Sequence, residues 1–326
     1  MKRAVTFALG VAAFYAAPAH AFDCKRAASE SEKAICADPA ALAADADLGK
    51  AFEALRVATD PKTRAALAAA EVAWLRRRDG DCSDQKGAAL GACLAAQSQA
   101  RVAFLTGAPQ VGSGAPGRLA PVFRMQKGGK GRTDIDIEVL KFVDPESPAQ
   151  RAFNAAVDKL SDDLQEPDKG DPDADNYAFA VSMRLAYASP RLISAHAERY
   201  VNMGGAHPNT DSADINIDVA QGRVAAFEAL LDKAGAQKLF ALCVKQVRDQ
   251  KREKGEDEEP DAAALKTLTE SVATASADLK VWSFGADAAT LTYDPYAVGA
   301  YAEGAFECKI PYSTLRPLAK PSFPLP

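Results

Sequence analysis

The residues best suited to chemistry in this 326-residue chain are few, and they gather in one segment. Of the three histidines, only His207 lies in a distinctive sequence, Tyr200-Val-Asn-Met-Gly-Gly-Ala-His-Pro-Asn209. A catalytic histidine needs a nucleophile and an orienting carboxylate, and a candidate such as Asp211 cannot be placed from sequence. The two glycines before His207 instead favour a tight turn in which the imidazole bonds backbone groups. We therefore interpret the segment as a binding turn.

The chain carries no G-x-S-x-G, H-E-x-x-H or P-loop motif, so we expect a protein without catalytic residues, cofactor or enzymatic activity. A structure in which an imidazole, an acid and a hydroxyl converge in a water-filled cleft would contradict this expectation. The candidate binding residues are Tyr200, Asn202, Gly204, Gly205, His207 and Asn209.

Two acidic segments are candidates for cation binding, and a simpler interpretation is favoured for both. Asp134, Asp136 and Glu138 alternate with apolar residues, which predicts one face of a strand exposed to solvent. Residues 166–175 contain five carboxylates but lack the order of a calcium-binding loop, which indicates an acidic surface loop. We therefore expect no metal site.

Six cysteines, an even number, predict disulfides in an oxidising compartment. No two are spaced as C-x₂₋₄-C and no histidine is near them, which disfavours zinc. We expect Cys243 to pair with Cys308, whereas three connectivities remain open for the others. These others are Cys24, Cys36, Cys82 and Cys93.

The N-terminus predicts export. Residues 1–21 have a basic start, an apolar stretch and the small-x-small sequence Ala19-His20-Ala21, as in a secretory signal peptide cleaved after Ala21. Loss of Lys2 and Arg3 would leave 37 basic and 44 acidic residues, so that the net charge changes from −5 to −7. No other stretch is long enough to span a membrane, and the acidity disfavours nucleic-acid binding. We expect a periplasmic or secreted protein.

The fold class is predicted as α+β in two domains. Residues 107–118, rich in Gly, Pro and Ser, form the expected flexible linker between residues 22–106 and residues 119–326. The first part is predicted as a small disulfide-stapled three-helix domain. The second is predicted as a mixed α+β domain with an antiparallel sheet and packed helices.

The elements of both domains can be placed approximately. Asp38-Pro39 and Asp60-Pro61 each combine an N-cap with a proline at the first helical position. The expected helices are 39–59, 61–79, 88–105, 148–164, 227–250 and 262–275. The expected strands are 133–139, 177–186, 192–201, 213–219, 281–284, 290–293 and 305–311.

One set of motifs extends over residues 22–105: Asp23-Cys24, Cys36, Asp45, Phe52, Trp74-Leu75, Arg78-Asp79, Cys82, Cys93-Leu94, Arg101 and Leu105. With these motifs the segment resembles the LprI family of secreted bacterial proteins. The chain departs from the family pattern at Glu71, where Gln is usual, and at Ser98, where Tyr is usual. The resemblance implies binding to lysozyme, because the founding member of the family is described as a lysozyme inhibitor.

A second set of motifs follows in residues 120–315: Tyr200–Asn209, Asn216-x-Asp218, Gly222-Arg223, Trp282-x-Phe284, Tyr293-x-Pro295-Tyr296, Tyr301-x-x-Gly304 and Ile310-Pro311-Tyr312. With these motifs the segment resembles the C-terminal domain shared by the anti-sigma factor RsiV and the peptidoglycan deacetylase PdaC. In RsiV this domain binds lysozyme, and it lies outside the catalytic part of PdaC.

Both resemblances imply binding to lysozyme, and we expect a protein that binds and inhibits a lysozyme-type muramidase. Such enzymes are commonly basic, so the acidity of this chain would accelerate their encounter. The alternative is a cell-wall or glycan-binding or envelope-stress module, in which Tyr296, Tyr301 and Tyr312 stack on the sugars of peptidoglycan.

Overall fold

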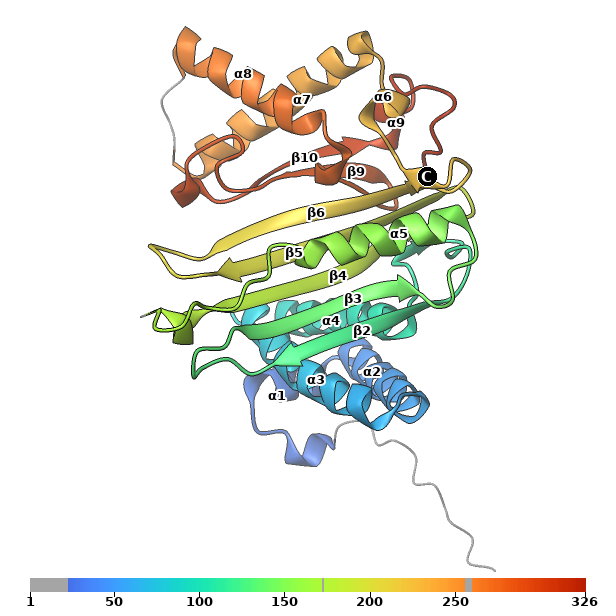
Figure 1. Cartoon of the computed structure of the whole chain (residues 1–326), viewed down its shortest axis with the longest axis vertical. Helices are drawn as coiled ribbons and strands as arrows, with labels where there is room; N and C mark the ends of the chain where they lie inside the picture. Colours follow the sequence, from blue (N-terminus) through green and yellow to red (C-terminus); the bar gives the residue numbers. More distant parts are fainter. Residues whose placement is uncertain (1–22, 172, 256–259) are drawn as a thin grey trace, which may run out of the picture.

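A computed structural model describes residues 23–171, 173–255 and 260–326, so the predicted signal peptide lies outside the described residues. A central sheet separates two helix-containing regions in the chain (Figure 1). The helices are α1 (Glu30–Ala37), α2 (Pro39–Ala58), α3 (Pro61–Asp81), α4 (Ala88–Thr106), α5 (Pro148–Asp158), α6 (Phe227–Leu230), α7 (Lys233–Glu253), α8 (Ala262–Ser276) and α9 (Tyr312–Leu315). The strands are β1 (Val111–Gly112), β2 (Leu119–Gln126), β3 (Asp134–Phe142), β4 (Ala178–Ala188), β5 (Leu192–Asn202), β6 (Asn209–Asp218), β7 (Arg223–Val224), β8 (Trp282–Phe284), β9 (Ala288–Tyr293) and β10 (Phe306–Pro311).

The three predicted N-terminal helices are confirmed as α2, α3 and α4. Asp38 and Asp60 accept backbone hydrogen bonds at the starts of α2 and α3, as expected of N-caps. The short helix α1 was not predicted from the sequence. Its start carries a reciprocal capping box between Ser29 and Glu32, a signal that was present in the sequence.

Two disulfides staple this helical region, and they resolve the open connectivity: Cys24 pairs with Cys36 and Cys82 with Cys93. Cys82 and Cys93 pack with Ile35 and small alanines in one cluster. Alanine side chains bury little apolar area, so covalent links are useful at this end of the helices.

The central sheet has the strand order β2-β3-β4-β5-β6-β7, with β1 beside the far end of β4. Most pairs are antiparallel as predicted, but β3 and β4 are parallel because the chain crosses over through α5 between them. Helix α5 packs Phe153 against Ile135 and Ile137 on one face of the sheet. The same core includes Leu67 and Phe104 from the helical region, so the helices and the sheet share apolar packing.

Residues 107–118 were expected to be a flexible connector, but they are attached to the sheet. The backbone N–H of Gln110 donates to the carbonyl of Leu185 at 2.8 Å, and that of Gly114 donates to Ala188 at 3.1 Å. Strand β3 pairs only with residues 178–182 of β4, which leaves the later part of β4 free to accept these bonds. The segment therefore fixes the helical region relative to the sheet.

The C-terminal unit, residues 225–326, has its own aromatic core. Trp282, Phe284 and Tyr293 are fully buried in it, and Cys243 is bonded to Cys308 as predicted. The predicted helix 227–250 is broken into α6 and α7, because Asp232 caps a new helix start. In the described residues, no helix has the length and apolar character needed to cross a membrane.

Candidate functional site

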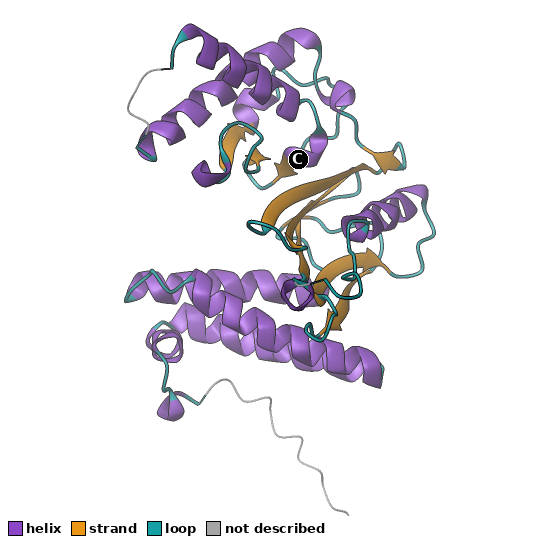
Figure 2. Cartoon of the chain, turned by 60° about the vertical axis from the view of Figure 1, so that its left-hand side comes forward, coloured by secondary structure: helices purple, strands orange, loops and turns teal. Residues whose placement is uncertain are grey.

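The two faces of the central sheet differ in chemistry. Helix α5 covers the apolar face, whereas the other face is turned toward the helical region and the C-terminal unit (Figure 2). Strand pairing aligns two polar rows on this second face. One row is Ser182, Glu198 and Ser212, and the other is Arg184, His196 and Asp214.

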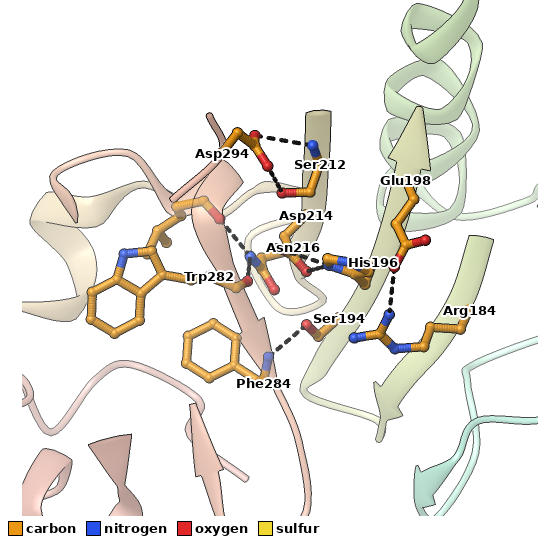
Figure 3. A network of polar contacts seen from close by, with 11 residues as sticks. Arg184, Ser194, His196, Glu198, Ser212, Asp214, Asn216, Trp282, Phe284 and Asp294 are labelled. Atoms are coloured by element: carbon orange, nitrogen blue, oxygen red, sulfur yellow. Dashed lines mark hydrogen bonds and ion pairs between the residues drawn. The ribbon is translucent and has the colours of Figure 1, made fainter. Parts of the chain in front are cut away.

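A buried ion pair lies at the centre of the second row. His196 Nδ1 is 3.1 Å from Asp214 Oδ1, and the side chain of Asp214 is fully buried (Figure 3). On the other side of the ring, Nε2 is 3.7 Å from Glu198 Oε1. Burial alone would lower the pKa of His196, but hydrogen bonds to Asp214 and Glu198 raise it to about 9. The imidazole is therefore protonated at neutral pH.

The C-terminal unit attaches to this face through neutral side chains of the sheet, which bind backbone groups and the carboxylate of Asp294. Asn216 Nδ2 donates to the carbonyls of Leu279 and Trp282, each at 2.8 Å. Ser194 Oγ accepts from the backbone N–H of Phe284 at 3.0 Å (Figure 3). Nearby, Asp294 accepts from the N–H and the hydroxyl of Ser212.

The helical region attaches to the same face through charges. Arg101 of α4 binds Glu138 of β3 and Glu71 of α3, and the Glu71 contact is 3.0 Å. Arg77 of α3 binds both Asp136 and Glu138. The strand face that carries Asp136 and Glu138 was predicted to be solvated. That prediction is wrong for Glu138, which is 1% exposed because the helices cover it.

Between the two attachments lies a polar cleft, formed by two adjoining cavities of about 430 and 510 Å³. Helices α3 and α4 line one cavity and strands β8, β9 and β10 line the other. The residues common to both are Gln110, Arg184, His196 and Glu198.

The cleft does bring together an imidazole, acids and hydroxyls, the combination that would favour a hydrolase. Their hydrogen bonds do not form a nucleophile–base relay in the described residues. Both nitrogens of His196 face carboxylates, and the hydroxyl of Ser212 is bonded to Asp294. A protonated imidazole also cannot accept a proton from a nucleophile. In the described residues, no cluster of metal-ligating side chains is present.

The predicted binding turn is the tip of the β5–β6 hairpin. Gly204 and Gly205 both have positive φ, 80° and 93°, which a tight turn of this kind requires. Tyr200 and Asn202 lie at the end of β5, and Asn209 begins β6.

His207 in this turn contacts aromatic residues of the β9–β10 loop. Its ring stacks on Tyr301 with centroids 3.9 Å apart, and the Tyr301 hydroxyl donates to the carbonyl of Pro208. Tyr296 is 64% exposed and holds a left-handed backbone at φ 74°, an unfavourable conformation for a bulky residue. Tyr312, by contrast, is buried with its hydroxyl on Gly285, so it does not stack on sugars.

The cleft was not predicted from the sequence, although a signal for it was present. Polar residues recur at alternate positions in two consecutive expected strands, and the next expected strand carries Asp214, which places these residues on one face. The contribution of α3 and α4 to the cleft wall could not be read in this way, because it depends on how the helices dock. The residues in question are Ser182, Arg184, His196, Glu198 and Asp214.

Comparison with known proteins identifies two segments. Residues 24–105 match the family described as lysozyme inhibitor LprI, and residues 229–313 match a family described as a protein of unknown function, DUF3298. No curated protein matches the chain.

Two solved structures are similar to part of this chain. A DUF3298 family protein from Pseudomonas aeruginosa PAO1 is 19% identical, with 64% of this chain and 96% of that chain covered at a TM-score of 0.40. A DUF3298 member from Bacteroides fragilis NCTC 9343 is 14% identical, with 63% and 94% covered at a TM-score of 0.43. The chain thus joins an LprI-type segment at residues 24–105 to a DUF3298-type segment at residues 229–313.

Proposed function

We propose that this protein is exported and that it binds and inhibits a lysozyme-type muramidase, without catalysing a reaction itself. The observation that carries the proposal is the match of residues 24–105 to the lysozyme inhibitor family LprI. All six cysteines are paired, which fits an oxidising extracellular compartment. The arrangement around His196 supports binding over catalysis, because both ring nitrogens already face carboxylates.

Electrostatics support the choice of a basic partner. The net charge of the chain is −5, and removal of the predicted signal peptide would bring it to −7. Opposite net charges raise the rate of encounter between two proteins, and salt screens this effect over about 8 Å at physiological ionic strength. Inhibition of a basic muramidase should therefore weaken as salt increases.

The test uses the oxidised chain from residue 22 to residue 326, with cell-wall lysis by a basic lysozyme as the readout. We expect saturable inhibition at low ionic strength and progressively weaker inhibition as sodium chloride is raised. The control is a neutral or acidic muramidase, for which salt should have a smaller effect. Undiminished lysis at every salt concentration would contradict the proposed function.

We further propose that the β5–β6 turn makes part of the contact. Its stacking on Tyr301 holds the turn in one conformation, which reduces the entropy lost on binding. Tyr296 beside it offers an exposed aromatic ring, the kind of side chain enriched among energetically important interface residues.

A pair of variants tests this contact surface. Tyr296→Ala should weaken inhibition by about tenfold or more, as expected for an aromatic anchor. Val224→Ala removes a side chain that is 47% exposed on β7, at the other end of β6, and should leave inhibition unchanged. Equal inhibition by the two variants would exclude the turn as a contact but would leave muramidase inhibition itself intact.

A further inference from the structure

The cleft between the helical region and the C-terminal unit has the size of a small-molecule site. Its two adjoining cavities, about 430 and 510 Å³, fall in the range typical of ligand pockets. Their shared floor is formed by β4 and β5. The cleft is independent of the turn proposed above to contact a muramidase.

Arg184, on this floor, is farther from its carboxylate partner than two arginines of the cleft wall are from theirs. In the cleft wall, Arg78 is 2.9 Å from Asp79 and Arg101 is 3.0 Å from Glu71. Arg184 is 3.9 Å from Glu198, beyond hydrogen-bond distance, and its side chain is 42% exposed. Its guanidinium therefore has donors available for a ligand.

The strand register places a second positive charge beside Arg184. His196 is directly opposite it on β5, and the imidazole is protonated at neutral pH as shown above. Like charges directly opposite one another in a sheet are destabilising. Two carboxylates compensate these charges: Asp214 is buried and 3.1 Å from His196, and Glu198 lies within 4 Å of both His196 and Arg184 but is 62% exposed. The imidazole therefore has a close partner, whereas the guanidinium of Arg184 has none within hydrogen-bond distance on this floor.

Neutral hydrogen-bonding groups line the helix side of the cleft. Ser182 and Gln97 line the cavity beside the helices, and Gln110 lines both cavities. The other cavity is lined by Thr290 and Thr292 of β9 but also by the carboxylates of Asp211, Asp294 and Glu307, which oppose an anion there. Hydroxyl and amide groups of this kind bind the hydroxyls and amides of a polar ligand.

We propose that this cleft binds a small polar molecule bearing a carboxylate, with the carboxylate on Arg184 and the remaining polar groups on Ser182, Gln97 and Gln110. Guanidinium and carboxylate form strong, often bidentate, charge-assisted hydrogen bonds. A carboxylate of this kind occurs in acidic sugars and at the C-terminus of short peptides.

Intrinsic fluorescence can report binding in the intact protein. Trp74 lines the cleft, whereas the other tryptophan, Trp282, is fully buried in the C-terminal core. The sugar probe is N-acetylmuramic acid, with N-acetylglucosamine as the matched compound that lacks the carboxylate. The peptide probe is N-acetyl-dialanine with a free C-terminus, and its control is the C-terminal amide. Calorimetry measures the same four titrations.

We expect saturable binding of at least one acidic probe and weaker or no binding of its uncharged control. Binding of only one acid identifies the ligand source as sugar or peptide. Arg184→Gln should weaken that binding by about tenfold or more, and Arg184→Lys should weaken it less. Arg223→Gln changes an exposed arginine on β7 and should bind as the unaltered protein does.

Three results would overturn the proposal. They are no binding of either acid, equal binding of the acids and their uncharged controls, and unchanged affinity in a folded Arg184→Gln protein. Thermal unfolding of each variant shows that it is folded.

Discussion

The helical region and the C-terminal unit pack on the same polar face of one sheet, yet they are attached by different chemistry. The helical region uses buried arginines and carboxylates around Glu138, and the C-terminal unit uses Asn216, Ser194 and an aromatic core. A charged attachment contains desolvated ions that stabilise each other, so removal of one partner leaves the other buried and uncompensated and lowers the free energy of unfolding strongly. A neutral attachment loses less when one bond is removed. The two regions should therefore respond differently to matched changes.

The largest effect is expected at the charged attachment. Arg101→Met should lower the free energy of unfolding by about 3–5 kcal/mol, because Glu71 and Glu138 stay buried without this partner. Chemical denaturation measures the change. Arg56→Met removes an exposed arginine of a surface ion pair on α2 and should have no measurable effect. A double variant, Arg101→Met with Glu71→Gln, should recover part of the loss. Equal stability of the Arg101 and Arg56 variants would show that the charges are not needed for attachment.

The disulfides of the two regions close loops of different length, which gives a second comparison between these regions. Cys243–Cys308 spans 65 residues, whereas Cys24–Cys36 spans 12. The entropy of loop closure predicts a loss of about 4 kcal/mol when the first is replaced by alanines and about 3 kcal/mol for the second. Denaturation of the two double variants measures both values. A larger loss for the short loop would contradict the entropic explanation.

The buried His196 lies between the two attachments and makes stability depend on pH. Its folded pKa of about 9 exceeds the ordinary value of 6.5, so the protonated form is stabilised by folding. This contribution, on the order of 3 kcal/mol, is complete below about pH 6.5 and is lost as pH rises toward about 9. His196→Gln should remove this part of the pH dependence, measured by denaturation across that range. His207→Gln changes an exposed histidine and should retain it. Identical pH profiles for the two variants would contradict the assignment.

The smallest of these effects is expected at the neutral attachment. Asn216→Ala leaves the carbonyls of Leu279 and Trp282 without this donor and should cost about 1–3 kcal/mol. Thermal unfolding is a sufficient measurement. Asn209→Ala, at the exposed start of β6, is the matched control and should change stability little. A loss as large as that of Arg101→Met would remove the contrast between the two attachments.

Local signals in the sequence predicted the elements well. The Asp-Pro pairs at 38–39 and 60–61 fixed two helix starts, and alternation predicted β3 and β6, whereas β2 was not predicted. Patterns of this kind act within a few residues, so they do not depend on distant contacts. The Cys243–Cys308 pairing was also predicted, from the position of these residues after the other four cysteines.

The arrangement of these elements could not be predicted in the same way. The alternation of Asp136 and Glu138 is the same for a solvated face as for one covered by arginines, and only docking of α3 and α4 distinguishes them. The Gly- and Pro-rich composition of residues 107–118 indicated a flexible connector. Composition does not reveal that an unpaired stretch of β4 lies beside these residues. The cleft depends on the docking of α3 and α4 and on the attachment of residues 107–118 to β4. The polar residues of the cleft could therefore be identified in the sequence, but the sequence did not show that they lie together.

The attachment of residues 107–118 to the sheet has a consequence for how such a chain can evolve by recombination. Gln110 and Gly114 are bonded to β4, and Arg101, in the matched segment 24–105, pairs with Glu138, which lies beyond the end of that segment. Exchange of residues 24–105 for those of a relative would separate this arginine from its acid and leave the sheet partly uncovered. Recombination at this junction should therefore succeed only when the residues on both sides are carried over together.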